Sequence, residues 1–259
     1  MNNIPIFDSL SHPSKENLWF GNSNINHSFS DLKEEYQKYN FIGGCAVQIP
    51  IMSKISAEDY YSQCIENNFY PVYYYNFDEG PSQIEKLYNI GYRAIKVHVR
   101  LGGVNPESEF NTLKRIFIEC KLLNMTVFFC TLICGDINLQ PDNGLLSVIT
   151  KLLKQVQGVK VILLHGGDVD LMRFVQLVRF NEDVLIDLSF TLQKFEGSSL
   201  DLDIEYLFKT FDKRICIGSD YPDYTIEKTR ERFNHFASKT TIEKAENIGY
   251  KNIQNFLGI

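Results

Sequence analysis

Short runs of β-branched or aromatic residues alternate with longer stretches of helical spacing along the whole chain. This alternation is typical of repeated βα units, in which each strand is followed by a helix. Some of the runs, such as VKVILLHGG at 159–167, are apolar on both faces, as expected for a parallel strand that helices cover. The predicted strands are Ile4–Leu10, Phe41–Ile49, Tyr70–Tyr75, Tyr92–Val99, Met125–Leu132, Val159–His165, Val184–Phe190 and Arg214–Ser219.

Three of the intervening segments carry signals for the start of a helix. Ser56 precedes AEDYYSQCIEN, Asn105 and Pro106 precede ESEFNTLKRIFIECKLL, and Asp168 precedes VDLMRFVQLVRF. Residues of these types are preferred at the N-cap and at the first helical position. Helices are therefore predicted to begin at these three places.

The number of units decides between two kinds of parallel sheet. No Gly-rich dinucleotide loop follows the first predicted strand, which disfavours an open doubly wound sheet. About eight βα units in 259 residues match a closed barrel of about 250 residues. Because no linker or charge block divides the chain, the sequence predicts one (β/α)8 barrel domain over residues 1–259.

Composition narrows the classes of partner. No apolar run approaches the ~20 residues of a membrane span, and the N-terminus lacks a signal-peptide pattern, so a cytoplasmic protein is expected. A net charge of −6 argues against nucleic acid as a partner and favours a small molecule. The six cysteines are scattered, which fits free thiols. A homodimer is a further possible assembly, since such barrels commonly pair, although the sequence shows no interface.

Polar residues gather at the ends of the predicted strands. In a (β/α)8 barrel the catalytic groups come from the C-terminal strand ends, because packed side chains fill the interior below. Several of the residues at these ends bind metals or transfer protons in other proteins. They are His12, His98, Cys130, His165, Asp187 and Asp220.

The fourth predicted strand carries three polar residues on one face. Alternation in IKVHVR places Lys96, His98 and Arg100 inward when the two valines face the helices. Lys96 and Arg100 are candidates for holding a substrate carboxylate or another oxyanion. The alternative is an ion pair inside the barrel with Asp187 or Asp8.

A long loop with one tryptophan follows the first predicted strand. The segment from Ser14 to His27 is longer than a usual βα connection and contains Trp19. It is either a flap over the barrel mouth, with Trp19 contacting substrate, or a surface loop with an aromatic anchor.

Six motifs follow one another along the chain. They are FDSLSHP, GYRAIKVHVR, VILLHGG, IDLSF, ICIGSDYP and a last helix with the sequence NIGYKNIQNFLGI. In order and spacing they resemble, over nearly the whole chain, the amidohydrolase superfamily in its amidohydrolase-2 or amidohydrolase-related branch.

The resemblance implies a divalent metal, most often zinc, held at the strand ends. Its ligands are a His-x-His pair on strand one, a strand-five histidine and a strand-eight aspartate, with a strand-six histidine as ligand or acid/base. His12, Asp220 and His165 match three of these positions. Leu10 and Cys130 replace the other two histidines, so the expected set is His12, Asp220 and either Cys130 or His165, or no metal at all.

Two hydrolytic mechanisms follow from this resemblance. With metal, bound water attacks a carbonyl carbon, Asp220 accepts the proton, and His165 or His98 polarises the carbonyl or protonates the leaving group. Without metal, Asp220 is the base and the histidines and Arg100 are electrophilic partners, as in the metal-free lactonases of this branch. The expected substrate is a small polar or anionic lactone, ester or sugar-acid derivative.

Other functions compete with hydrolysis. A related decarboxylase uses similar residues, and a barrel that has lost catalysis would bind a ligand or a protein, with Leu10 and Cys130 as its evidence. Cys130 as a nucleophile is disfavoured, because an apolar strand surrounds it. Ser189 and Ser219 are interpreted as hydrogen-bonding wall residues, since neither lies in a Gly-x-Ser-x-Gly motif.

Overall fold

Eight parallel strands form a barrel in chain order. The structure is a computed structural model that describes residues 4–14, 19, 27–49, 55–132 and 137–259. Each strand pairs with the next one along the chain, from the first strand to the eighth. The strands are β1 (Ile6–Ser11), β2 (Phe41–Val47), β3 (Tyr70–Tyr74), β4 (Ala94–Val97), β5 (Thr126–Cys130), β6 (Val161–Leu164), β7 (Val184–Asp187) and β8 (Ile215–Cys216).

Backbone hydrogen bonds join β1 to the residues that follow β8. The Ser9 amide donates to the Ile217 carbonyl at 2.9 Å, and the Asp220 amide donates to the Leu10 carbonyl at 2.9 Å. The His12 amide donates to the Tyr221 carbonyl at 2.8 Å. These bonds close the ring of strands, and the predicted (β/α)8 barrel is confirmed.

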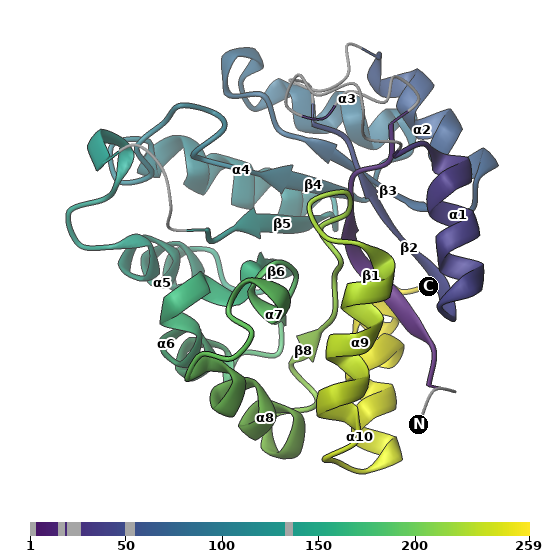
Figure 1. The fold of residues 1–259 in the computed structure, drawn as a ribbon. Coiled ribbons are helices and arrows are strands. Elements are labelled where there is room, and N and C mark those ends of the chain that lie inside the picture. Colours follow the sequence, from purple (N-terminus) through teal and green to yellow (C-terminus); the bar gives the residue numbers. More distant parts are fainter. Residues whose placement is uncertain (1–3, 15–18, 20–26, 50–54, 133–136) are drawn as a thin grey trace.

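Helices surround the ring of strands on the outside, as Figure 1 shows. The longer ones alternate with the strands, and the chain ends in a helical segment with one π-helical turn at Asn247–Lys251. The helices are α1 (Phe29–Lys38), α2 (Ala57–Glu66), α3 (Ser82–Ile90), α4 (Phe110–Leu122), α5 (Leu145–Gln155), α6 (Leu171–Val178), α7 (Thr191–Lys194), α8 (Leu200–Thr210), α9 (Ile226–Ala237), α10 (Ile242–Glu246) and α11 (Asn252–Leu257).

One of the three predicted helix starts is right and two are wrong. Ser56 caps α2, since its side chain accepts a hydrogen bond from the Asp59 amide. Asn105 instead accepts the Glu107 amide in a turn, and α4 begins only at Phe110. Asp168 has φ 56° and its carboxylate lies 3.1 Å from Lys194 Nζ, so it belongs to a short 3-10 segment before α6.

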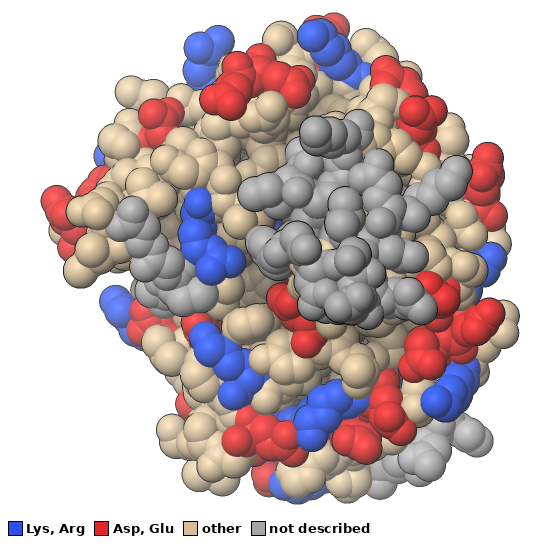
Figure 2. All heavy atoms as spheres, turned by 45° about the horizontal axis from the view of Figure 1, so that its top comes forward, with Lys and Arg blue, Asp and Glu red and all other residues tan. Residues whose placement is uncertain are grey.

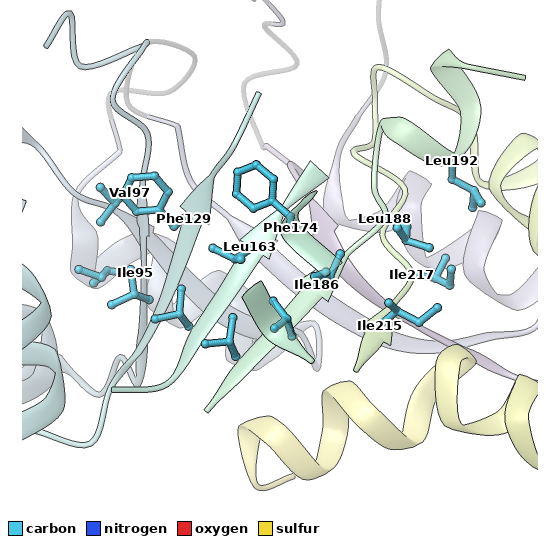
Figure 3. Packing of buried hydrophobic residues seen from close by; sticks show 14 of the residues in the cluster. Ile95, Val97, Phe129, Leu163, Phe174, Ile186, Leu188, Leu192, Ile215 and Ile217 are labelled. Atoms are coloured by element: carbon cyan, nitrogen blue, oxygen red, sulfur yellow. The ribbon is translucent and has the colours of Figure 1, made fainter. Parts of the chain in front are cut away.

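The core has two layers, separated by the wall of the barrel. The outer layer lies between strands and helices, and includes Ile95, Val97, Phe129 and Leu163 from neighbouring strands with Phe174 from α6 (Figure 3). The inner layer fills the barrel interior. It consists of Phe7, Leu10, Cys45, Val47, Val72, Ala94, Phe128, Ile162, Leu164, Leu185, Cys216 and Ile253.

Leu10 is a packing residue of this inner layer. It is fully buried, and it lies two positions before His12, so both side chains start on the inner side of β1. A histidine at this position would place a polar ring among apolar side chains. Leu10, which replaces the first histidine of the His-x-His pattern, therefore adds apolar packing to the barrel interior below the cavity.

Neither sign of charge dominates the face of the molecule that Figure 2 shows. Acidic and basic side chains are interspersed on the face that Figure 2 shows. In the described part of the chain, no helix combines the length and the apolar composition that crossing a membrane requires.

Candidate active site

A cavity of about 470 Å³ opens where the strands end. It collects six of the residues that the sequence singled out from separate strands and loops, together with Trp19. Cys130 lies against His98 and is outside the cavity lining. The described lining residues are His12, Trp19, Ile49, Lys96, His98, Arg100, Leu101, Leu132, His165, Phe190, Asp220 and Asp223.

His12 follows β1 and is held in one tautomer. Its Nδ1 lies 2.8 Å from the Val47 carbonyl, which can only accept, so Nδ1 carries the proton. Burial, together with the nearby charge of Lys96, lowers the pKa of His12 to about 4. His12 is therefore neutral at neutral pH, and its Nε2 lone pair is an acceptor.

Two groups meet at that lone pair. Asp220 Oδ1 lies 3.3 Å from His12 Nε2, and Lys96 Nζ lies 3.3 Å from the same nitrogen. Two acceptors cannot bond to each other, whereas the Lys96 amino group can donate to His12. The three side chains thus form one cluster with Lys96 as the donor.

Asp220 is kept ionised by this cluster. Burial raises the pKa of the carboxyl, but the positive charges of His165 and Lys96 favour the ionised form, and the pKa is held below its usual range. Burial lowers the pKa of Lys96, while the charges of Asp220 and Cys130 oppose that shift. The carboxylate is therefore available to accept a proton from water.

A second cluster lies around the Cys130 thiol. His98 accepts the Leu101 amide at Nδ1, 3.3 Å away, so its Nε2 carries the proton and donates to Cys130 Sγ at 3.4 Å. Burial opposes the thiolate, but His98 and His165 outweigh burial and hold the pKa of Cys130 well below the usual range of a thiol. The two histidines therefore favour the thiolate form of Cys130.

His165 is the counter-cation of that thiolate. Its Nδ1 lies 3.3 Å from the Ser189 carbonyl and 3.1 Å from Ser189 Oγ, and Ser189 Oγ in turn donates to Asp187. Burial lowers the pKa of His165, but Cys130 outweighs it and raises the pKa to about 9. His165 therefore adds a positive charge to the cavity wall.

Trp19 closes one side of the cavity. Its ring stacks on His12 at 5.4 Å between centroids, and its Nε1 donates to Asp223 Oδ1 at 2.7 Å. Trp19 thus lines the cavity, and its predicted contact with substrate stays a prediction. Most of the predicted flap between Ser14 and His27 lies outside the described residues.

The residues of this site do not form a metal centre. In the described ranges, no group of three or more His, Cys, Asp or Glu side chains is arranged so that it could hold a metal ion. The cationic Lys96 Nζ also lies 3.3 Å from His12 Nε2, the ring nitrogen that a metal would bind. The expected ligand set of His12, Asp220, Cys130 and His165 does not fit the group.

The ion pair considered for Lys96 is not found. Asp8 accepts hydrogen bonds from Leu10, Tyr36 and Ser219, and Asp187 accepts them from Ser9, Ser189 and the His165 amide. These carboxyls are satisfied by amides and hydroxyls, while Lys96 contacts His12. Asp187 is thus a residue that orients Ser189 and His165.

Asp223 is the site residue that the sequence interpretation missed. It lines the cavity and binds the Trp19 indole, and burial raises the pKa of its carboxyl. Its position three residues after Asp220, in SDYPD, was the signal that could have identified it.

Comparison with known proteins places this site in a family. The Amidohydrolase family model matches residues 76–259. The chain belongs to the amidohydrolase family. The resemblance inferred from the strand-end motifs is confirmed, and membership indicates an enzyme. No curated protein is significantly similar to the chain in sequence.

Solved structures share the barrel of this amidohydrolase at low identity. An uncharacterised TIM-barrel protein from Bordetella bronchiseptica has a TM-score of 0.74 at 14% identity, covering 90% of this chain and 83% of that one. A probable 2-pyrone-4,6-dicarboxylic acid hydrolase from Acinetobacter baumannii, with citric acid bound, has a TM-score of 0.72 at 15% identity, covering 100% of both chains. A 5-carboxyvanillate decarboxylase from Sphingomonas paucimobilis has a TM-score of 0.67 at 9% identity, covering 91% and 84%.

The thiolate assignment makes a spectroscopic prediction. In a Cys134→Ser background, the ultraviolet absorbance of one thiolate is expected at neutral pH and is lost on Cys130→Ser, because burial raises the pKa values of the other described cysteines. His165→Gln should move formation of the thiolate to higher pH. Equal absorbance with and without Cys130, or a thiolate that forms only at alkaline pH, contradicts the assignment.

Asp8, below the cavity, makes a prediction about stability and pH. It is fully buried, and burial raises its pKa from 3.8 to about 7 against four opposing hydrogen bonds. Between these two values the unfolded carboxyl ionises before the folded one, so stability contributed by protonated Asp8 is lost as pH rises.

Asp8→Asn removes this titration. Relative to wild type, the variant's free energy of unfolding should rise between about pH 4 and pH 7, by an amount on the order of a few kcal/mol. Urea unfolding at several pH values measures it, with the exposed Asp142→Asn as the matched control. A difference between variant and wild type that does not change with pH would count against the buried protonated carboxyl.

Proposed function

We propose that this amidohydrolase hydrolyses a lactone or activated ester of a small anionic substrate, and that it does so without a metal. The observation that carries the proposal is the ionised Asp220 beside His12 and Lys96 at a cavity that His165 also lines. The cavity offers a base for water and several donors for oxygen. Those are the two requirements of metal-free acyl hydrolysis.

The charges of the cavity favour an anionic substrate. Lys96, Arg100 and the protonated His165 line it, against Asp220 and Asp223. Arg100 can hold a carboxylate with two parallel hydrogen bonds. The volume of about 470 Å³ suits a small molecule.

The chemistry favours an activated acyl group. Asp220 has a lowered pKa and is therefore a weak base, which assists water only when the carbonyl is electrophilic and the leaving group is good. Lactones and activated esters meet this condition better than amides. The fold that the chain shares with a probable pyrone-dicarboxylate hydrolase is consistent with this choice.

Decarboxylation is the second candidate. The cations that would hold a substrate carboxylate would also hold one that leaves as carbon dioxide, and a decarboxylase shares the fold. Release of carbon dioxide from 5-carboxyvanillate, in place of ring opening of a lactone, would favour it.

The experiment is an assay with 2-pyrone-4,6-dicarboxylate and a set of sugar lactones, in the presence and absence of chelator. Turnover is expected to be the same in both conditions. Asp220→Asn should lower kcat by at least ~10²-fold while the protein still binds substrate, because the base that activates water is lost.

The matched control is Asp183→Asn, since Asp183 immediately precedes β7 at the opposite end of the barrel. Full activity of Asp220→Asn, or activity that chelator abolishes and zinc restores, would contradict the proposed mechanism. Binding without turnover in wild type and variant alike would favour the ligand-binding barrel.

A further inference from the structure

We propose that the amino group of Lys96, which lies beside the His12 nitrogen that a catalytic metal would bind, holds the substrate carbonyl oxygen in place of the metal. The inference rests on the hydrolytic function proposed above and assigns the electrophile of that reaction. It also explains two departures of the chain from the metal-binding pattern.

The backbone of β4 directs Lys96 to this position. Ala94 belongs to the interior layer of the barrel, whereas Ile95 and Val97 belong to the outer layer, so Lys96 starts on the inner side of the strand. The residue is only 2% exposed, yet it lines the cavity. Burial of a lysine amino group costs free energy unless the group forms hydrogen bonds or binds a ligand.

The head group contacts the nitrogen of His12 that a metal would bind. Nζ lies 3.3 Å from His12 Nε2, and that nitrogen lies 3.3 Å from Asp220 Oδ1. Because Nδ1 of His12 is bound to the Val47 carbonyl, Nε2 holds the lone pair of the ring that is available to a cation. The Lys96 amino group and a metal ion would therefore compete for the lone pair of His12 Nε2.

An ammonium group has hydrogen-bonding capacity beyond His12. It carries three donors, of which one serves His12, and the other two remain for a ligand in the cavity. The attraction between a compact cation and a carbonyl oxygen becomes stronger as negative charge develops on that oxygen.

The reaction can then be written with this chain's own residues. Asp220 takes a proton from water while the water oxygen bonds to the carbonyl carbon and the carbonyl electron pair moves to oxygen, beside Lys96. The tetrahedral intermediate collapses, the carbon–oxygen bond of the ester breaks, and the proton on Asp220 goes to the leaving oxygen. Water and ester become an acid and an alcohol, with Lys96 and Asp220 returned to their starting states.

The lysine also makes the missing metal ligands unnecessary. Leu10 packs in the barrel interior, and Cys130 is a partner of His98. A site whose positive charge comes from Lys96 needs neither residue as a ligand.

The first test does not depend on turnover. An imidazole is shorter than a lysine side chain, so in Lys96→His the ring nitrogen would stop about one Zn–N bond, roughly 2 Å, before the present position of Nζ. Lys96→His should therefore bind about one equivalent of zinc, with His12 and Asp220 as the other ligands. Wild type and Lys96→Met should bind none at this position, and Asp220→Asn should abolish the zinc binding of Lys96→His.

The readout is a zinc titration of untagged protein by calorimetry, with thermal unfolding to verify that each variant folds. Zinc bound by wild type through His12 and Asp220 would overturn the proposal, because lysine would then not hold the position. Failure of a folded Lys96→His variant to bind zinc would also overturn it, because the position would not be a metal position.

The second test uses a lactone that wild type hydrolyses. Lys96→Met should lower kcat by at least ~10²-fold with little change in KM, because the lost amino group interacts most strongly with the oxyanion that develops in the transition state. Arg100→Met, the matched control on the same cavity, should raise KM more than it lowers kcat. A Lys96→Met variant that changes only KM would make Lys96 a carboxylate anchor and contradict the proposal.

The two tests separate the possible failures. If wild type hydrolyses no lactone or ester but Lys96→His gains zinc, the hydrolytic function is wrong and the position of Lys96 stands. If wild type is a hydrolase but zinc binds without substitution, the function stands and the assignment of Lys96 fails.

Discussion

The pairing of β1 with the residues after β8 is the constraint on which the site depends. The Asp220 amide bonds to the Leu10 carbonyl, and the His12 amide bonds to the Tyr221 carbonyl. These backbone bonds join segments about two hundred residues apart in sequence and bring His12 Nε2 within 3.3 Å of Asp220 Oδ1. Without closure of the barrel, the side chains of His12 and Asp220 would not meet at one end of the cavity.

Charge in the cavity is balanced between two clusters. His12, Lys96 and Asp220 form the first, and Cys130, His98 and His165 the second. Lys96 and His165 supply positive charge while Asp220 and Cys130 supply negative charge, and burial makes each of these interactions stronger than it would be in water. The left-handed φ values of His165, 65°, and Asp220, 56°, show that the backbone is held in uncommon conformations at both clusters.

The sequence predicted the barrel and most of the site, for a physical reason. Period-two alternation in IKVHVR and the positions of His12, His165 and Asp220 at strand ends are local features, and a closed parallel barrel places all such ends at one rim. The predicted helix starts at Asn105 and Asp168 failed because those side chains are used elsewhere: Asn105 forms a turn with Glu107 and donates to the Gln140 carbonyl, and Asp168 pairs with Lys194.

What the sequence left open depended on distances between strands. Spacing along the chain cannot tell whether Lys96 contacts Asp8, Asp187 or His12, because the answer depends on which way a long side chain turns inside the barrel. The tautomers of His12 and His98 likewise follow from contacts with Val47 and Leu101 that belong to other segments. The fit of a metal was undecidable from residue types alone, since the types are suitable and the arrangement is not.

The most direct test of this account is a crystal structure of the wild-type protein grown with zinc, with anomalous scattering measured at the zinc edge. The account predicts density for Lys96 Nζ at hydrogen-bond distance from His12 Nε2, and no anomalous peak between His12 and Asp220. An anomalous peak bonded to His12 Nε2 and Asp220, with the Lys96 side chain displaced, would contradict it.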